Sequence, residues 1–216
     1  MYVGVGQQRF PSPSAMRKEK MLKIKIDYKS FFKRGVPNIN DDFFIRLITG
    51  YQGSGKSFLG VKMCHELEKN RKIKTNMKSY HELEKKIEYF DSIDDIINDN
   101  DDNITYLIDE LSKKYTKDSK QDLRFYSWLQ QSRKHKRHVY LITQEYLQVP
   151  TWLRGVANTV YITSKLPILP IYRTSLGHPI LDENFEWSLS ETSVLFYKRT
   201  KEISNLYDTF ESINSL

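Results

Sequence analysis

One stretch, residues 50–57, constrains this chain more than any other, because it reads G-x-x-x-x-G-K-S. This is the pattern of the phosphate-binding loop, in which glycines let the backbone turn its N–H groups toward one point. The apolar run before it, residues 43–49, has the composition of a buried parallel strand. After the loop, apolar side chains recur at helical spacing, at Phe58, Val61, Cys64 and Leu67. The motif therefore lies between a strand and a helix, the context that it requires.

The chemistry of this loop predicts a nucleotide site for ATP and Mg²⁺. Lys56 is expected to reach the β- and γ-phosphates, and the Ser57 hydroxyl is expected to bind Mg²⁺. The helix N-terminus behind the glycines adds partial positive charge. The predicted nucleotide contacts are Gly50, Tyr51, Gln52, Gly53, Ser54, Gly55, Lys56, Ser57 and Phe58.

Two further apolar runs end in polar residues that suit hydrolysis. Residues 104–108 are followed by Asp109, expected to hold the Mg²⁺ hydration shell, and Glu110, expected to act as general base on the attacking water. Two turn acids after a strand would look the same, but the separation from Lys56 is typical of ATPases. Residues 139–143 are followed by Gln144, which is either a sensor of the γ-phosphate or a turn residue.

Composition and charge permit a polyanionic partner without requiring one. The chain has 216 residues, a net charge of +7, 28% charged and 39% hydrophobic residues, as in a soluble globular protein. Cys64 is the only cysteine, which excludes an internal disulfide and favours a reducing compartment. No apolar run approaches the length of a membrane span or of a secretory signal core.

The remaining pattern predicts an α/β fold with a mostly parallel sheet and helices on both faces. We expect residues 1–20 to be a flexible basic tail and residues 21–216 to be one P-loop ATPase domain. The central strands should end at Thr49, Ile108 and Thr143, with ATP at their carboxyl ends. Outer strands are predicted at residues 22–28, 72–76, 160–163 and 194–197.

Three helices are predicted after the first one, at residues 80–86, 90–102 and 121–132. The last of these has one apolar face, formed by Leu123, Tyr126 and Leu129. Residues 166–174 are expected to be a loop or an edge strand, and residues 177–179, Gly-His-Pro, are expected to form a turn.

The order of these motifs resembles the FtsK–HerA branch of P-loop ATPases, with the RecA/FtsK-like fold of ring-forming DNA pumps. Within it, the chain most resembles the zonular-occludens-toxin-like (Zot) ATPases of filamentous phages and the genome-packaging ATPases of membrane-containing viruses. The resemblance is carried by residues 50–57, 107–110, 132–135 and 141–144. Residues 150–154 before a strand are also similar to the family, and so, more weakly, is Tyr207-Asp208-Thr209.

This resemblance implies a homo-oligomeric ring, usually a hexamer, with ATP between subunits and a basic residue completing the neighbour's site. Arg133 matches the position of the family's arginine finger, and Arg137 and Arg154 are its rivals. The others, with Lys134 and Lys136, would contact DNA phosphates without reading sequence. A solvated basic face is the alternative for this cluster.

Three functions fit these observations. The first is an ATP-driven double-stranded DNA translocase that packages a viral genome, docked on a portal or capsid vertex in the virion or host cytoplasm. The second is a Zot-like ATPase for phage assembly and export. The third is a small-molecule or nucleotide kinase, which would have an arginine-bearing lid and no trans arginine. The family's membrane-bound members carry a transmembrane helix, so an expectation of no stable membrane insertion favours the first.

Overall fold

A computed structural model describes residues 43–68, 70–82, 86–166, 171–181 and 187–207. The tail predicted at residues 1–20 and the strand predicted at 22–28 lie outside these ranges. The described strands are β1 (Phe44–Thr49), β2 (Lys72–Thr75), β3 (Ile87–Tyr89), β4 (Ile104–Ile108), β5 (His138–Ile142), β6 (Thr159–Lys165), β7 (Ile171–Leu181) and β8 (Trp187–Lys198). The described helices are α2 (Lys56–Leu67), α3 (Ile93–Ile97), α4 (Leu123–Gln130), α5 (Thr151–Arg154) and α6 (Lys201–Ser204), with 3₁₀ turns η1 (Leu111–Lys113) and η2 (Tyr146–Gln148).

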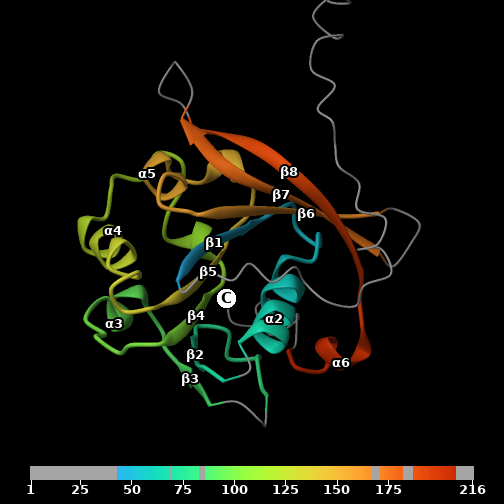
Figure 1. The fold of residues 1–216 in the computed structure, drawn as a ribbon, viewed down its shortest axis with the longest axis horizontal. Coiled ribbons are helices and arrows are strands. Elements are labelled where there is room, and N and C mark those ends of the chain that lie inside the picture. Colours follow the sequence, from blue (N-terminus) through green and yellow to red (C-terminus); the bar gives the residue numbers. More distant parts are fainter. Residues whose placement is uncertain (1–42, 69, 83–85, 167–170, 182–186, 208–216) are drawn as a thin grey trace, which may run out of the picture.

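These strands form one sheet in the order β3-β2-β4-β5-β1-β6-β7-β8 (Figure 1). The pairs from β3 to β6 are parallel, and the pairs β6–β7 and β7–β8 are antiparallel. The three strands predicted to be central, β4, β5 and β1, are adjacent, so the predicted α/β fold with a mostly parallel sheet is confirmed. Their carboxyl ends meet at one edge of the sheet.

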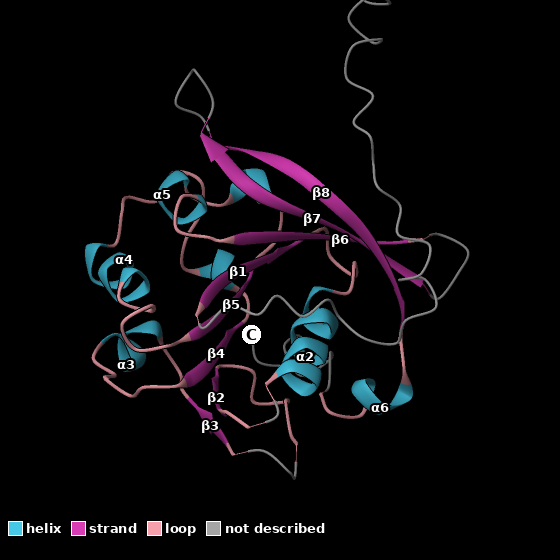
Figure 2. Ribbon diagram, viewed as in Figure 1, coloured by secondary structure: helices cyan, strands magenta, loops and turns pink. Residues whose placement is uncertain are grey.

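Helices cover both faces of this sheet (Figure 2). Helices α2 and α6 pack on one face, and α3, α4 and α5 pack on the other, each side with its own apolar cluster. All six residues of β1 are buried. Its side chains alternate between the clusters, with Ile48 facing α2 and Leu47 facing the opposite layer. None of the helices in the described ranges has the length and apolar character that crossing a membrane demands.

Three predictions about local structure are wrong. Residues 80–82 and 86 are not helical; Tyr80 closes a turn with Met77 instead, and the chain then enters β3 beside β2. A pattern confined to one or two turns lacks the length that stabilises a helix. In α4, the buried side chains are Phe125, Trp128 and Leu129, while Leu123 is 70% exposed, because aromatic packing under α5 sets the orientation of the helix.

The third wrong prediction is the turn at residues 177–179, which lie inside β7 and pair with β8. A register shift between Leu176 and Gly177 absorbs the irregularity. The last pair between β6 and β7 is Val160 with Gly177, so Pro179 has a strand on one side only. A proline is tolerated there because no second strand needs its missing N–H. Strand β7 also settles the alternatives at residues 171–174, which are strand and not loop.

A buried carboxylate ties the end of α2 to the sheet. Glu68 follows α2 and is 1% exposed. It accepts hydrogen bonds from the Tyr140 hydroxyl at 2.8 Å and the Thr105 hydroxyl at 3.0 Å, and it pairs with His138 at 2.9 Å. Burial alone would raise the pKa of Glu68, but the bonds from these three partners outweigh it and hold the pKa below its ordinary value. The side chain therefore stabilises the fold in its ionised form.

Replacing Glu68 by Gln should lower the free energy of unfolding by about 2–4 kcal/mol at pH 7, since a buried polar network loses its charge. Because the folded pKa is depressed, this contribution is complete above the unfolded pKa and is lost as the pH falls through the folded value. The difference between wild type and variant should thus shrink below about pH 4. Denaturant unfolding at several pH values measures it. Glu202→Gln, on an exposed side chain of α6, is the control; an equal loss in both variants would contradict the prediction.

Candidate functional site

The loop at residues 50–57 lies at the carboxyl edge of the sheet and leads from β1 into α2. Gly50, with φ 150°, donates its N–H to the Gln144 carbonyl at 3.1 Å. A Cβ on Gly50 would lie 2.4 Å from the Thr163 carbonyl oxygen. Only glycine allows this close approach, which fixes the start of the loop between the ends of β5 and β6.

Residues from β6 and β7 brace the rest of the loop. The Ser54 hydroxyl lies 2.8 Å from the Thr163 hydroxyl, which itself donates to the Thr49 carbonyl at 3.1 Å. The Tyr172 ring packs on Gly55, where a Cβ would lie 2.6 Å from the ring. Tyr172 also stacks on Phe58, with 5.9 Å between ring centroids. The last parallel strand, β6, and the first antiparallel strand, β7, therefore hold the glycine turn in position.

Lys56 crosses the loop and donates to the carbonyls of Gly50 and Tyr51, both at 2.9 Å. Burial lowers the pKa of Lys56, and the Asp109 carboxylate offsets part of this shift. The ammonium group thus lies over the concave backbone where phosphate oxygens would bind, and these could replace the two carbonyls as its acceptors. Tyr51 and Gln52 are exposed at the rim of the loop, with 73% of Tyr51 accessible.

The predicted Mg²⁺ ligands are in contact. The Ser57 hydroxyl donates to Asp109 Oδ2 at 2.8 Å, while Asp109 Oδ1 accepts the Glu110 N–H at 2.7 Å. Burial raises the pKa of Asp109, although these two hydrogen bonds oppose the shift. Asn76 holds the Asp109 backbone through two bonds of 2.8 and 2.9 Å. One hydroxyl and one carboxylate side by side fit Mg²⁺, which takes few protein ligands and fills its shell with phosphate oxygens and waters.

Glu110 and Gln144 flank this pair. Glu110 has a left-handed backbone, with φ 54°, and its exposed carboxylate is ion-paired with Lys113. Gln144 is exposed two residues after the end of β5, and its carbonyl accepts the Gly50 N–H. The structure therefore brings Lys56, Ser57, Asp109, Glu110 and Gln144 to one edge of the sheet.

Arg133 lies at the other edge, in the turn between α4 and the start of β5. It is exposed, and its guanidinium is 5.5 Å from the Phe43 ring centroid. Its two rivals are buried: Arg137 is 1% exposed over Trp128, and Arg154 donates to the carbonyls of Val149 and Leu147 at 2.8 Å. Of these three arginines, only Arg133 can reach another molecule, and the length of β5 separates it from its own phosphate loop.

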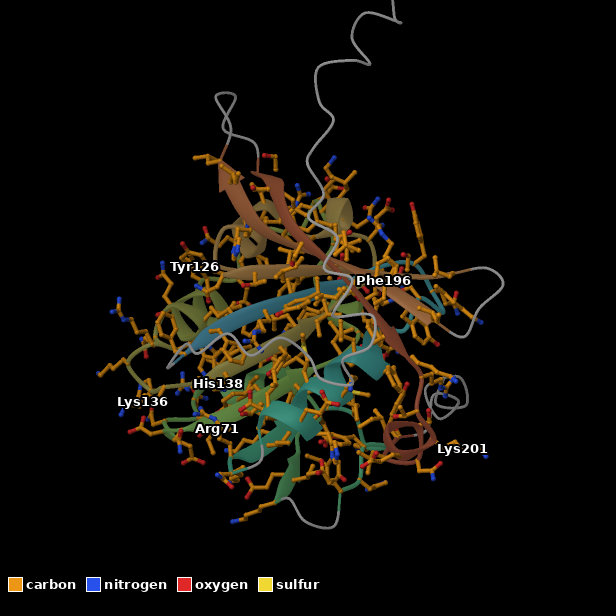
Figure 3. The ribbon with its side chains drawn as sticks, turned by 45° about the vertical axis from the view of Figure 1, so that its right-hand side comes forward. Arg71, Tyr126, Lys136, His138, Phe196 and Lys201 are labelled. Atoms are coloured by element: carbon orange, nitrogen blue, oxygen red, sulfur yellow. The ribbon has the colours of Figure 1, made fainter. Side chains whose placement is uncertain are left out.

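The other basic residues of the cluster divide in the same way. Lys134 and Lys136 are exposed, whereas His135 pairs with Asp102 at 2.7 Å and His138 is tied to Glu68. Figure 3 shows Lys136 and His138 beside Arg71, which donates to the Lys136 carbonyl. Only part of the predicted basic face is available to a partner.

Some residues of the site were missed by the sequence analysis. Asn76, Thr163, Tyr172 and Lys113 carry no motif, and three of them act through contacts with residues far away in the chain. One signal was available: Asn76 is the last residue of the strand predicted at residues 72–76, where a polar residue reaches the carboxyl edge. Tyr207 is buried, and burial raises its pKa to about 12; Asp208 and Thr209 of the same motif lie outside the described residues.

Comparison with known proteins found one protein-family model and several solved structures that are similar to this chain. A protein-family model described as zonular occludens toxin (Zot) matches residues 44–212. The structure is similar to the N-terminal domain of zonular occludens toxin from Neisseria meningitidis, with 19% identity, a TM-score of 0.57 and coverage of 76% of this chain and 98% of that chain. At that identity, the likeness concerns the fold.

Further matches are weaker. The genome packaging NTPase B204 of Sulfolobus turreted icosahedral virus 2, in complex with sulfate, has 12% identity and a TM-score of 0.49 over 74% of this chain and 98% of that chain. The RadB recombinase has 13% identity and a TM-score of 0.49 over 73% and 87%. No curated protein matched the sequence.

Alanine at Gly55 should destabilise the fold more than alanine at Gly53. Both glycines have positive φ, 89° and 74°, but only Gly55 has a neighbour, Tyr172, in the way of a Cβ. Backbone strain alone should cost about 1–2 kcal/mol at Gly53, and overpacking should add about 1–3 kcal/mol at Gly55. Denaturant unfolding of both variants measures this. Tyr172→Ala should relieve part of the added cost in a double-mutant cycle; strict additivity would contradict the contact.

Proposed function

Because this chain belongs to the zonular occludens toxin (Zot) family, we propose that it is a phage or viral ATPase that translocates double-stranded DNA. The observation that carries the ATPase assignment is the 2.8 Å contact between Ser57 and Asp109, beside Lys56 and Glu110. A phosphate loop alone would support binding; the adjacent acid pair supports cleavage.

In the proposed reaction, Lys56 and the N–H groups of the loop hold the β- and γ-phosphates. Ser57 and Asp109 would hold Mg²⁺, which would supply charge neutralisation to the phosphates. Glu110 accepts a proton from water as the water oxygen bonds to the γ-phosphorus and the bond to the β–γ bridging oxygen breaks. Gln144, next to the loop, orients that water. The products are ADP and inorganic phosphate.

The position of Arg133 supports a site completed by a neighbouring copy. It lies at the edge opposite Lys56, so it can reach a γ-phosphate only in another subunit. A guanidinium there would stabilise charge that develops on the γ-phosphate as the bond breaks. We therefore propose a homo-oligomeric ring, with six subunits as the resemblance implies, around double-stranded DNA, with portal or vertex proteins as the docking partner in packaging.

A second candidate is a Zot-like role in phage assembly and export, which the family match itself favours. It shares the ATPase site and differs in what the hydrolysis drives. DNA-independent turnover would favour this role, whereas stimulation by duplex would favour translocation. No observation favours the kinase alternative, and we do not propose it.

Purified protein should hydrolyse ATP with Mg²⁺ and should be stimulated by double-stranded DNA of mixed sequence. The stimulation should fall steeply with salt, because phosphate contacts release counterions. Lys56→Ala should abolish turnover by removing phosphate contacts, and Glu110→Gln should bind ATP without hydrolysing it. A phosphate-release assay and a nucleotide titration measure both. Unchanged turnover in Glu110→Gln would assign the base to another residue, and no ATP binding by wild type would reject the ATPase.

Arg133→Ala should also lose hydrolysis, by about 10³-fold or more if it acts as an arginine finger. Mixing it with Glu110→Gln protein should restore part of the activity, because an interface with Arg133 from one copy and Glu110 from the other is intact. Lys134→Ala, an exposed neighbour, is the matched control and should keep hydrolysis of ATP alone. Lack of rescue in mixtures shown to form joint assemblies would contradict the trans role.

A further inference from the structure

A lysine-rich segment follows the proposed catalytic base directly. Residues 113–121, here called the lysine segment, contain Lys113, Lys114, Lys117 and Lys120 and a single acid, Asp118. All four lysines are exposed. Because β4 ends just before Glu110, this segment begins at the carboxyl edge of the sheet, next to the phosphate loop.

The lysine segment is a built surface. Tyr115 is 5% exposed, stacks on Phe125 with 5.6 Å between centroids, and donates its hydroxyl to Asp122 at 2.5 Å. The Thr116 N–H is bonded to the Ser119 hydroxyl at 2.8 Å. These contacts fix the backbone, so the lysines project from a defined turn. Preorganised cations lose less freedom when they bind a regular polyanion.

The lysines differ in their partners. Lys114 pairs with Asp94 at 3.3 Å. Within the described ranges, Lys117 and Lys120 have no ion-pair partner, so their charges are available to an external anion. Lys113, in contrast, is ion-paired with the Glu110 carboxylate, and its N–H donates to the Glu110 carbonyl at 2.9 Å.

The ion pair between Lys113 and Glu110 opposes the proposed role of Glu110. The pair directs the carboxylate toward Lys113 instead of a water molecule. With 57% and 43% of their side chains exposed, the two residues form a surface ion pair, which is worth little and is easily exchanged.

We propose that the lysine segment binds the phosphate backbone of double-stranded DNA and that Lys113 couples this binding to hydrolysis. Without DNA, Lys113 restrains Glu110. With DNA, a backbone phosphate replaces Glu110 as the partner of Lys113, and Glu110 turns to the attacking water. This inference rests on the proposed function, and in it Lys113 is a positioning residue for Glu110.

The exposed lysines at the opposite edge cannot provide this coupling. Lys134 and Lys136 lie before β5, at the start of the strand, whereas Glu110 lies after β4, at the end of its strand. DNA bound there would touch no residue that contacts Glu110 of the same chain. The lysine segment, in contrast, contains the partner of Glu110 within its own length.

The test measures kcat and KM for ATP of the full chain, with and without a random-sequence duplex. Lys113→Gln should raise kcat without DNA several-fold, leave KM for ATP unchanged and reduce the stimulation by DNA. Lys113→Arg should restore the wild-type pattern, since it keeps the ion pair. A loss of folding would lower kcat, so a rise in kcat cannot come from damage to the structure.

The same duplex should bind less tightly to the double variant Lys117→Gln, Lys120→Gln. The slope of log K against log salt should fall by about 1 for each lysine removed. Lys201→Gln is the control: this exposed lysine is on α6, which packs on the face of the sheet opposite α4, the helix that follows the lysine segment, and it should keep the wild-type affinity and slope.

Each outcome decides the matter. A wild-type chain that neither hydrolyses ATP nor binds duplex would overturn the proposed function and this inference together. If wild type is stimulated by DNA, the inference alone fails in any of three cases. The first is that Lys113→Gln has the same kcat without DNA as wild type, or has lost turnover. The second is that DNA stimulates Lys113→Gln as much as wild type. The third is that the double variant binds duplex as tightly as Lys201→Gln.

Discussion

The rest of the structure depends on the parallel pairing of β1 with β5 on one side and β6 on the other. Parallel strands end at the same edge, so this pairing brings three chain segments to one place. Gly50 then bonds to the Gln144 carbonyl from β5 and lies against Thr163 from β6, a contact that no residue with a Cβ could make. The phosphate loop owes its shape to these two neighbours as much as to its own glycines.

What the sequence predicts well is local or periodic. Each of three features is recognised from a short stretch of sequence: the glycine motif, the acid pair after a buried run, and the strand at residues 139–143. That they lie side by side follows from the common direction of the parallel strands. Tyr172 against Gly55 and Asn76 against Asp109 join distant segments, so no short pattern contains them. The helix expected at residues 80–86 failed although its pattern was local, because one or two turns are too short to be stable and Tyr80 closes a turn with Met77 instead.

Burial separates basic residues that are equivalent in sequence. The sequence alone does not rank Arg133, Arg137 and Arg154. In the structure, Arg137 covers Trp128, and Arg154 donates to the carbonyls of the segment before α5. Both arginines are buried, so neither guanidinium is presented to an external phosphate. Within the described residues, exposed positive charge lies at both ends of the central strands, near Arg133 at one end and in the lysine segment at the other.

In the function proposed above, the edge with Arg133 meets a neighbouring subunit, and the edge with the lysine segment meets the polyanion. Strand direction places Lys56, Asp109 and Glu110 at one end of the sheet and Arg133 at the other, and no side chain is long enough to span β5. A single chain can then bind a nucleotide through Lys56 but lacks the arginine that would stabilise the charge developing on the γ-phosphate during cleavage. Stacking copies edge to edge would supply that arginine, while each lysine segment lies beside Glu110 of its own chain. Hydrolysis would then respond to the neighbouring subunit through Arg133. It would respond to the bound polyanion through Lys113, which lies only a few residues after Glu110.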